Sequence, residues 1–188
     1  MVKGNLSQDL TINSQDEIQE MAENFDQMRH SLRDSIKKIE EQNGKLYQEA
    51  YFNTLTKLPN RKKLYSDLNE QAITALLVVN INDFSEFNDF YGINSGDAII
   101  IEVAERITKY CQALNDWTVH KTGPDEFSIA YISAPSMSLT RAALADFANQ
   151  LSDSICQKAL VLDNNKFYIS VSIGGAMIDT DLATNITL

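Results

Sequence analysis

Long hydrophobic segments are missing from this sequence of 188 residues. No apolar run approaches the roughly 18 to 20 residues that a membrane-spanning helix requires, and the N-terminus lacks the apolar core of a signal peptide. We therefore expect the chain itself to be soluble. Only two cysteines occur, Cys111 and Cys156, and neither has the close Cys or His neighbours of a metal site. We interpret both as inert thiols in a reducing, cytosolic compartment.

Positive charge is also scarce. The chain has 16 Lys and Arg residues against 26 Asp and Glu residues, which gives a formal net charge of −10. The resulting field repels nucleic-acid backbones and anionic membrane surfaces, so binding to nucleic acid is not expected. A small anionic ligand such as a nucleotide is still compatible with this charge, because a metal ion or backbone N–H groups can reverse the field inside a pocket.

Residues from about 16 to 51 have the pattern of one long amphipathic helix. Its apolar residues recur at spacings of three and four, and one step of four followed by four resembles a stutter. Glu and Lys residues lie beside this stripe, which is typical of a parallel two-stranded coiled coil and predicts a homodimer through the helix. The alternative is a core helix packed on its own domain, although the stripe is longer than in most globular helices. The stripe comprises Ile18, Met21, Phe25, Met28, Leu32, Ile36, Ile39 and Leu46.

Pro59 ends this helix, and the remainder of the chain alternates between helical and strand patterns. The order predicts an α/β (α+β) domain with a ferredoxin-like sheet covered by helices. We interpret Gly174 and Gly175 as the end of the last strand. The predicted helices are 61–72, a further helix before 95, 95–114 and 138–160, and the predicted strands are 74–81, 118–121, 127–132 and 167–173, with a hairpin turn at 122–126.

Four motifs carry a resemblance to a known family. They are Leu55-Thr-Lys-Leu-Pro-Asn-Arg61, Asn80-Ile-Asn-Asp83, the segment from Phe84 to Asp97, and Gly123-Pro-Asp-Glu-Phe127. In order and spacing they resemble the GGDEF domain of diguanylate cyclases, over roughly residues 51–176. The resemblance implies the cyclase-palm form of the fold. It also implies a reaction in which two GTP-loaded domains form cyclic di-GMP, with carboxylate-bound metal ions stabilising phosphoryl transfer.

The resemblance implies that the nucleotide-binding half of the site is retained. Asn88 and Asp97 stand at the positions that read guanine, and an amide and a carboxylate suit its donors and acceptors. Asp83, Phe84 and Gly123 complete the predicted nucleotide-binding set, and GTP is the predicted ligand.

The same comparison predicts a damaged catalytic half. Asn80 replaces a metal-binding Asp, and Ser85 replaces a phosphate-facing Lys. Pro124 replaces the second Gly of the signature, so the N–H and the conformational freedom of that glycine are lost. Asp125 and Glu126 remain as catalytic remnants, with Asp125 as a weak metal ligand. Each change alone is tolerable, but three losses at one phosphate group predict weak Mg²⁺ binding and no efficient catalysis.

Three smaller points accompany these predictions. Leu114-Asn-Asp-Trp117 stands where the family has its inhibitory Arg-x-x-Asp, so no inhibitory cyclic di-GMP site is predicted. His30 is interpreted as a surface residue and His120 as a structural one. Asn53 replaces the Asp that usually opens the Leu-Thr motif.

The N-terminus resembles a second family. Gly4-Asn-Leu-Ser and the segment Asp16 to Met28 resemble the second half of a HAMP linker, with Gln19 in place of a common Gly. This implies a parent protein with these residues on the cytoplasmic side of a bacterial inner membrane. We predict a partial HAMP region and signalling helix over 1–52 and a degenerate GGDEF domain over 53–188, with the family's final helix and an EAL-type domain beyond Leu188.

The leading hypothesis is a degenerate GGDEF domain that senses GTP or relays a signal in cyclic di-GMP signalling and controls a downstream EAL phosphodiesterase or receptor domain. One alternative is a weakly active diguanylate cyclase. Another is a dimerisation spacer that binds no nucleotide.

Overall fold

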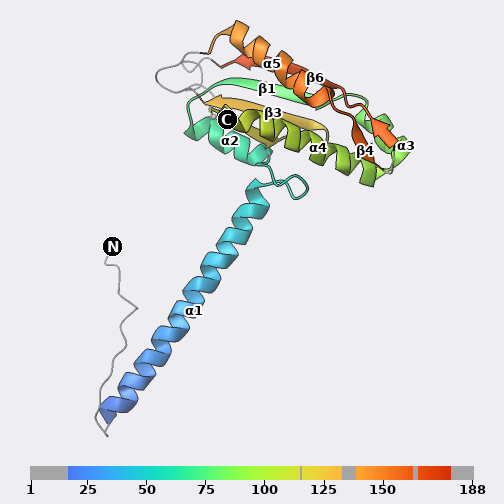
Figure 1. The fold of residues 1–188 in the computed structure, drawn as a ribbon. Helices are drawn as coiled ribbons and strands as arrows, with labels where there is room; N and C mark the ends of the chain where they lie inside the picture. The colour runs from blue at the N-terminus through green and yellow to red at the C-terminus, as the bar shows by residue number, and fades with distance from the viewer. Residues whose placement is uncertain (1–16, 115, 133–138, 163–164, 179–188) are drawn as a thin grey trace. The chain divides into compact units, whose positions relative to one another are not determined.

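The structure is a computed structural model, and it describes residues 17–114, 116–132, 139–162 and 165–178 (Figure 1). Its contacts divide the chain into two units, Met1–Gln48 and Glu49–Leu188. Each unit is described by itself below.

The first unit contains most of helix α1, Glu17–Tyr51. The helix ends where the pattern predicted, and His30 is exposed as predicted. The predicted stripe is 40% to 70% exposed over Met21, Phe25, Met28, Leu32, Ile36, Ile39 and Leu46. Burying one such side chain contributes about 1.5 to 3 kcal/mol, so a single copy of this helix leaves much potential stabilisation unused. No helix in the described ranges is long and apolar enough to span a membrane.

The second unit is built on a four-stranded sheet in the order β2-β3-β1-β6, with every neighbouring pair antiparallel. The strands are β1 (Ile73–Ile81), β2 (Trp117–Lys121), β3 (Glu126–Ile132) and β6 (Val171–Met177). Burial alternates strictly along β1, so its two faces meet different surroundings. This arrangement confirms the predicted α/β, ferredoxin-like architecture.

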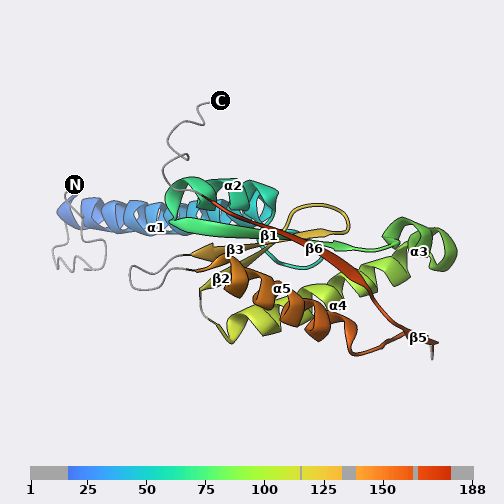
Figure 2. The same ribbon diagram turned by 90° about the horizontal axis from the view of Figure 1, so that it is seen from above.

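Helices cover both faces of this sheet. Figure 2 shows α4 (Ile93–Gln112) and α5 (Arg141–Cys156) together on one face and α2 (Arg61–Glu70) on the other. The short helix α3 (Phe84–Tyr91) follows β1 directly. The main core lies between the sheet and the α4–α5 pair, where Leu77, Val79, Ile107, Phe127 and Leu151 are almost fully buried.

The predicted last strand, 167–173, was wrong. Phe167 ends β5 (Asn165–Phe167), which pairs with β4 (Leu160–Leu162), and the sheet strand begins only at Val171. Gly174 and Gly175 do not end the strand, because they lie inside β6 opposite Val78 and Leu77. A Cβ atom at Gly175 would stand 2.4 Å from Leu77 Cδ2. Close packing, rather than termination, therefore explains this glycine.

Other boundaries differ by a few residues. The predicted helix 138–160 is shorter, Arg141–Cys156, because residues 160–162 form β4 instead. The predicted helix 61–72 ends at Glu70, and the predicted helix 95–114 begins at Ile93 and ends at Gln112.

Candidate functional site

A compact turn joins α1 to α2. The side-chain Oδ1 of Asn53 accepts hydrogen bonds from the backbone N–H of Leu55 at 3.1 Å, from the N–H of Thr56 at 2.9 Å and from the Thr56 hydroxyl at 3.0 Å. An amide oxygen is sufficient for this role, so Asn53 fills the place of the family's Asp. The turn also reaches β2, because the N–H of Lys121 donates to the Pro59 carbonyl at 2.7 Å.

Lys121 lies beneath the signature hairpin. Its ammonium group donates to the carbonyls of Gly123, Pro124 (2.9 Å) and Glu126 (3.3 Å), and it lies 4.5 Å from the centroid of the Phe127 ring. Burial lowers the pKa of Lys121 to about 8, although Asp125 and Glu126 act in the opposite direction. Sequence reasoning missed this residue. The available signal was a lysine at a core-facing position of a strand.

The hairpin accommodates Pro124. Within the described ranges, φ is positive only at Lys57, Asp83 and Gly92, so the turn over residues 123–125 needs no left-handed residue. The backbone N–H of Ile81 donates to the Asp125 carbonyl at 3.0 Å and ties the hairpin to β1. A proline at the second signature position is therefore compatible with this backbone.

The carboxylates at this edge are not grouped around one point in the described residues, and one of them, Glu126, is engaged by a hydrogen bond. Asn80 stands opposite Glu126 in the β1–β3 register, so a neutral amide occupies the strand end. The Thr122 hydroxyl donates to Glu126 Oε1 at 2.7 Å. In the part of the chain that the structure describes, no group of three or more His, Cys, Asp and Glu side chains is arranged to hold a metal ion.

The N-terminus of α3 is the other half of the predicted phosphate region. Asp83 precedes the helix with φ of 54°, in the left-handed region, and its side chain makes no capping hydrogen bond. Phe84 is 8% exposed and packs in the core, so only its backbone N–H is available to a ligand. The exposed Ser85 follows. The first N–H groups of a helix have no intrahelical acceptor and favour an anion.

Asn88 and Asp97 come from α3 and α4, and Gly96 brings the two helices together. A Cβ atom at Gly96 would lie 1.8 Å from Asn88 Oδ1. That oxygen is buried and has no hydrogen-bond partner in the described structure. Asp97, half-buried, is the next residue. An unsatisfied acceptor beside a carboxylate fits the donor edge of a guanine base. Sequence reasoning placed Gly96 in the loop and helix start beside the site but gave it no role, because that role depends on a contact between two helices.

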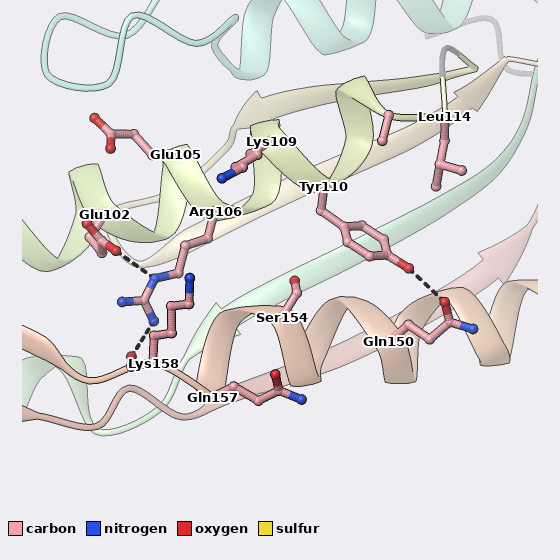
Figure 3. A pocket seen from close by; sticks show the side chains of 11 residues that line it. Glu102, Glu105, Arg106, Lys109, Tyr110, Leu114, Gln150, Ser154, Gln157 and Lys158 are labelled. Carbon is pink, nitrogen blue, oxygen red and sulfur yellow. Dashed lines mark hydrogen bonds and ion pairs between the residues drawn. The ribbon is translucent and has the colours of Figure 1, made fainter.

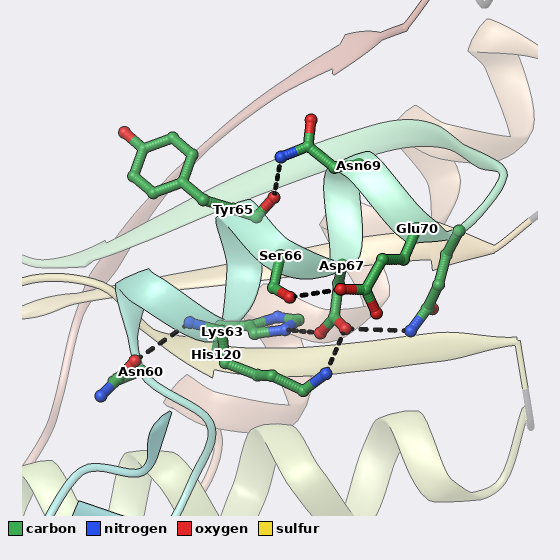
Figure 4. A network of polar contacts seen from close by, with 9 residues as sticks. Asn60, Lys63, Tyr65, Ser66, Asp67, Asn69, Glu70 and His120 are labelled. Atoms are coloured by element: carbon green, nitrogen blue, oxygen red, sulfur yellow. Dashed lines mark hydrogen bonds and ion pairs between the residues drawn. The ribbon is translucent and has the colours of Figure 1, made fainter. Parts of the chain in front are cut away.

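A buried polar network links α2 to β2 (Figure 4). Asp67 accepts from Lys63 Nζ at 2.6 Å and from Gln71 Nε2 at 3.0 Å, and its other oxygen lies 3.0 Å from His120 Nε2. Burial lowers the pKa of His120, against the opposing effect of Asp67. Burial alone would raise the pKa of Asp67, but its bonds to Lys63 and His120 bring it below the ordinary value. The network agrees with a structural role for His120.

A groove with a volume of about 740 Å³ lies elsewhere, between α4 and α5 (Figure 3). Arg106 spans it, bonding to Glu102 Oε1 at 2.7 Å and to the carbonyls of Ile155 and Lys158, the latter at 2.7 Å. Leu114 lines the groove. Trp117 stacks on Phe147 with 3.8 Å between ring centroids, so the position of the family's inhibitory Asp belongs to the packed interior.

The antiparallel sheet and its covering helices have the architecture of a cyclase palm. A family model described as the diguanylate cyclase GGDEF domain matches residues 50–187, and a HAMP domain model matches residues 1–34. The chain belongs to the GGDEF domain family, with a HAMP region at its N-terminus.

Several known proteins are similar to this chain. It is 36% identical over 148 residues to the bifunctional diguanylate cyclase/cyclic di-GMP phosphodiesterase MucR of Pseudomonas aeruginosa, covering 74% of this chain and 20% of MucR. It is 25% identical over 154 residues to diguanylate cyclase DgcP of Escherichia coli, and the match covers 78% of this chain and 43% of DgcP. The chain thus spans less than half the length of either relative.

Solved structures show the same fold. The coiled coil and GGDEF domain of DgcB from Caulobacter crescentus, solved with c-di-GMP, superposes with a TM-score of 0.69 at 22% identity, covering 82% of this chain and 84% of that one. The S helix-GGDEF-EAL structure of Vibrio cholerae LapD superposes with a TM-score of 0.59 at 19% identity, and the match covers 80% of this chain and 35% of the LapD chain.

Proposed function

We propose that this domain is a catalytically degenerate GGDEF module that binds a guanine nucleotide and relays a signal in cyclic di-GMP signalling. The contrast between the two halves of its site carries the proposal. The guanine half has a buried free acceptor, Asn88 Oδ1, next to Asp97. The phosphate half has Asn80 at the strand end and an exposed Ser85 at the helix start. Asp83, Phe84 and Gly123 remain the proposed nucleotide neighbours.

Little or no cyclic di-GMP should form when the chain is incubated with GTP and Mg²⁺ or Mn²⁺. The physical reason is the missing charge, because phosphoryl transfer requires metal ligands and a cation at the phosphates. The triple variant Asn80→Asp, Ser85→Lys, Pro124→Gly should raise product formation on the order of a hundredfold, since single electrostatic groups in active sites contribute about 10² to 10³ in rate. Product is measured by chromatography.

Adding Asp125→Asn to the triple variant should remove the gain, because Asp125 is the proposed remaining metal ligand. If the unmodified chain already forms product at the rate of the triple variant, the degenerate interpretation is wrong and the weakly active cyclase is correct. If no guanine ligand binds to the unmodified chain, the spacer alternative holds.

The exposed stripe of α1 supports a proposed homodimer through this helix. Sedimentation equilibrium should show a concentration-dependent dimer, because two such stripes bury each other's apolar side chains. Ile36→Glu should shift the equilibrium to monomer by placing a charge in the seam. Gln48→Glu, on the opposite face of the same helix, is the matched control and should leave the dimer intact. A monomer at all concentrations would contradict the proposal.

The HAMP match supports a membrane-associated parent with this domain on the cytoplasmic side. The named activities of MucR and the composition of the LapD structure support an EAL-type domain after the GGDEF domain. In that arrangement the nucleotide state of this domain regulates a phosphodiesterase or receptor. Deleting the GGDEF domain from the full-length parent and measuring cyclic di-GMP hydrolysis or binding tests this role, and unchanged function of the downstream domain would exclude it.

A further inference from the structure

We infer that this site selects its ligand by the guanine base and not by the phosphates, so that it takes guanine nucleosides and monophosphates as readily as GTP. The inference rests on the proposed guanine site and specifies its ligand class. It follows from the distribution of charge around the two halves of that site.

The phosphate half is surrounded by negative charge. Asp83 precedes α3, and Glu86 and Asp89 lie on it. Asp125 and Glu126 lie on the hairpin that is tied to the end of β1. A triphosphate carries several negative charges, and repulsion from nearby carboxylates grows with each added phosphate. The N–H groups at the start of α3 attract an anion only within about one helical turn.

The cations near this edge do not offset these carboxylates. The ammonium group of Lys121 is buried under the hairpin and donates to three of its carbonyls. Arg61, on α2, donates to the Tyr65 hydroxyl at 3.1 Å. Ser85 supplies no charge at the exposed first turn of α3. The described part of this edge is therefore strongly acidic.

The base half has a different character. The acceptor Asn88 Oδ1 is buried between α3 and Gly96, and it lacks a hydrogen-bond partner. Leaving such an atom unsatisfied is unfavourable, so a donor from a base is favoured once the Asn88 amide turns from Gly96 toward the ligand. Together with the Asp97 carboxylate it then offers two acceptors, which match the adjacent N1–H and N2–H2 donors of guanine. Adenine presents a single donor beside an acceptor on that edge, and neither contact involves the phosphates.

The test is calorimetric titration of guanosine, GMP and GTP into the 188-residue chain in EDTA at two salt concentrations, with adenosine as the base control. Guanosine and GMP should bind within about threefold of GTP or more tightly, and adenosine at least about tenfold more weakly than guanosine. Higher salt should strengthen GTP binding by screening the repulsion and leave guanosine unchanged.

A charge variant sharpens the test. Ser85→Lys should shift the preference toward GTP by about tenfold, because it adds a cation at the start of α3. Asn149→Lys adds the same charge at an exposed site on α5 and should leave the preference unchanged. If GTP binds the unmodified chain more than about tenfold tighter than guanosine, the inference is overturned and the proposed guanine site survives. If no guanine ligand binds, or adenosine binds equally well, both fall.

Discussion

Replacing Gly96 by alanine is expected to abolish guanine binding while leaving the domain folded. The added Cβ would lie 1.8 Å from Asn88 Oδ1, a separation that real contacts do not reach, so the Asn88 amide must leave its position. Helix α4 itself gains from the change, because alanine is a better helix former than glycine by about 1 kcal/mol. Titration calorimetry should show at least about a hundredfold weaker binding of guanosine, with an unfolding midpoint close to that of the unmodified chain.

Two further variants distinguish displacement of the Asn88 amide from a general disturbance of the structure by the added methyl group. Gly44→Ala changes a helical glycine with no neighbouring atom within 4 Å of the new Cβ and should leave guanine binding unaltered. In an Asn88→Ala background, Gly96→Ala should weaken binding no further, since the two changes remove the same interaction. Full guanine affinity in Gly96→Ala would show that Asn88 does not read the base.

The second large effect concerns stability. Asp67→Ala is expected to destabilise the domain by about 1 to 3 kcal/mol, because it leaves the buried imidazole of His120 without its hydrogen-bond partner and removes one acceptor of Lys63. The side chains of His120 and Asp67 are 1% and 6% exposed, so water does not readily replace the lost partner. Urea unfolding followed by circular dichroism measures the change.

Asp146→Ala is the matched control, since Asp146 is an exposed residue of α5 and should change stability by less than about 0.5 kcal/mol. A cost below about 1 kcal/mol for Asp67→Ala would mean that the network contributes little to the fold. The expected result would instead show that the polar network adds substantially to the apolar packing of Leu64 in holding α2 on the sheet.

The sheet and its principal helices could be predicted from the sequence because their local hydrophobic patterns agree with the tertiary arrangement. The continuous apolar segment ending at Ile81 forms the central strand β1, and Pro59 lies in the turn that separates α1 from α2. The motif positions also placed Asn88 and Asp97 in one loop and helix start, and the structure puts them on α3 and α4, although their roles remain predictions.

Other features depend on contacts that no local pattern records. A pair of glycines such as Gly174 and Gly175 is typical of a strand end. Position 175 nevertheless needs a glycine because Leu77 occupies the space that a side chain would take. Gly96 is defined in the same way by Asn88. Lysine is a residue type usually found at the surface. Only the tertiary structure shows that the ammonium group of Lys121 is surrounded by carbonyl groups of the hairpin.

Lys121 connects the turn that follows α1 directly to the signature hairpin. Its backbone N–H holds the Pro59 carbonyl of the turn that follows α1, and its side chain holds the carbonyls of the signature hairpin. A shift of that turn is therefore transmitted to the hairpin through Lys121, the last residue of β2. This connection requires neither a metal ion nor a phosphate. The position of the hairpin is in this way coupled to the turn that precedes α2, whatever occupies the site.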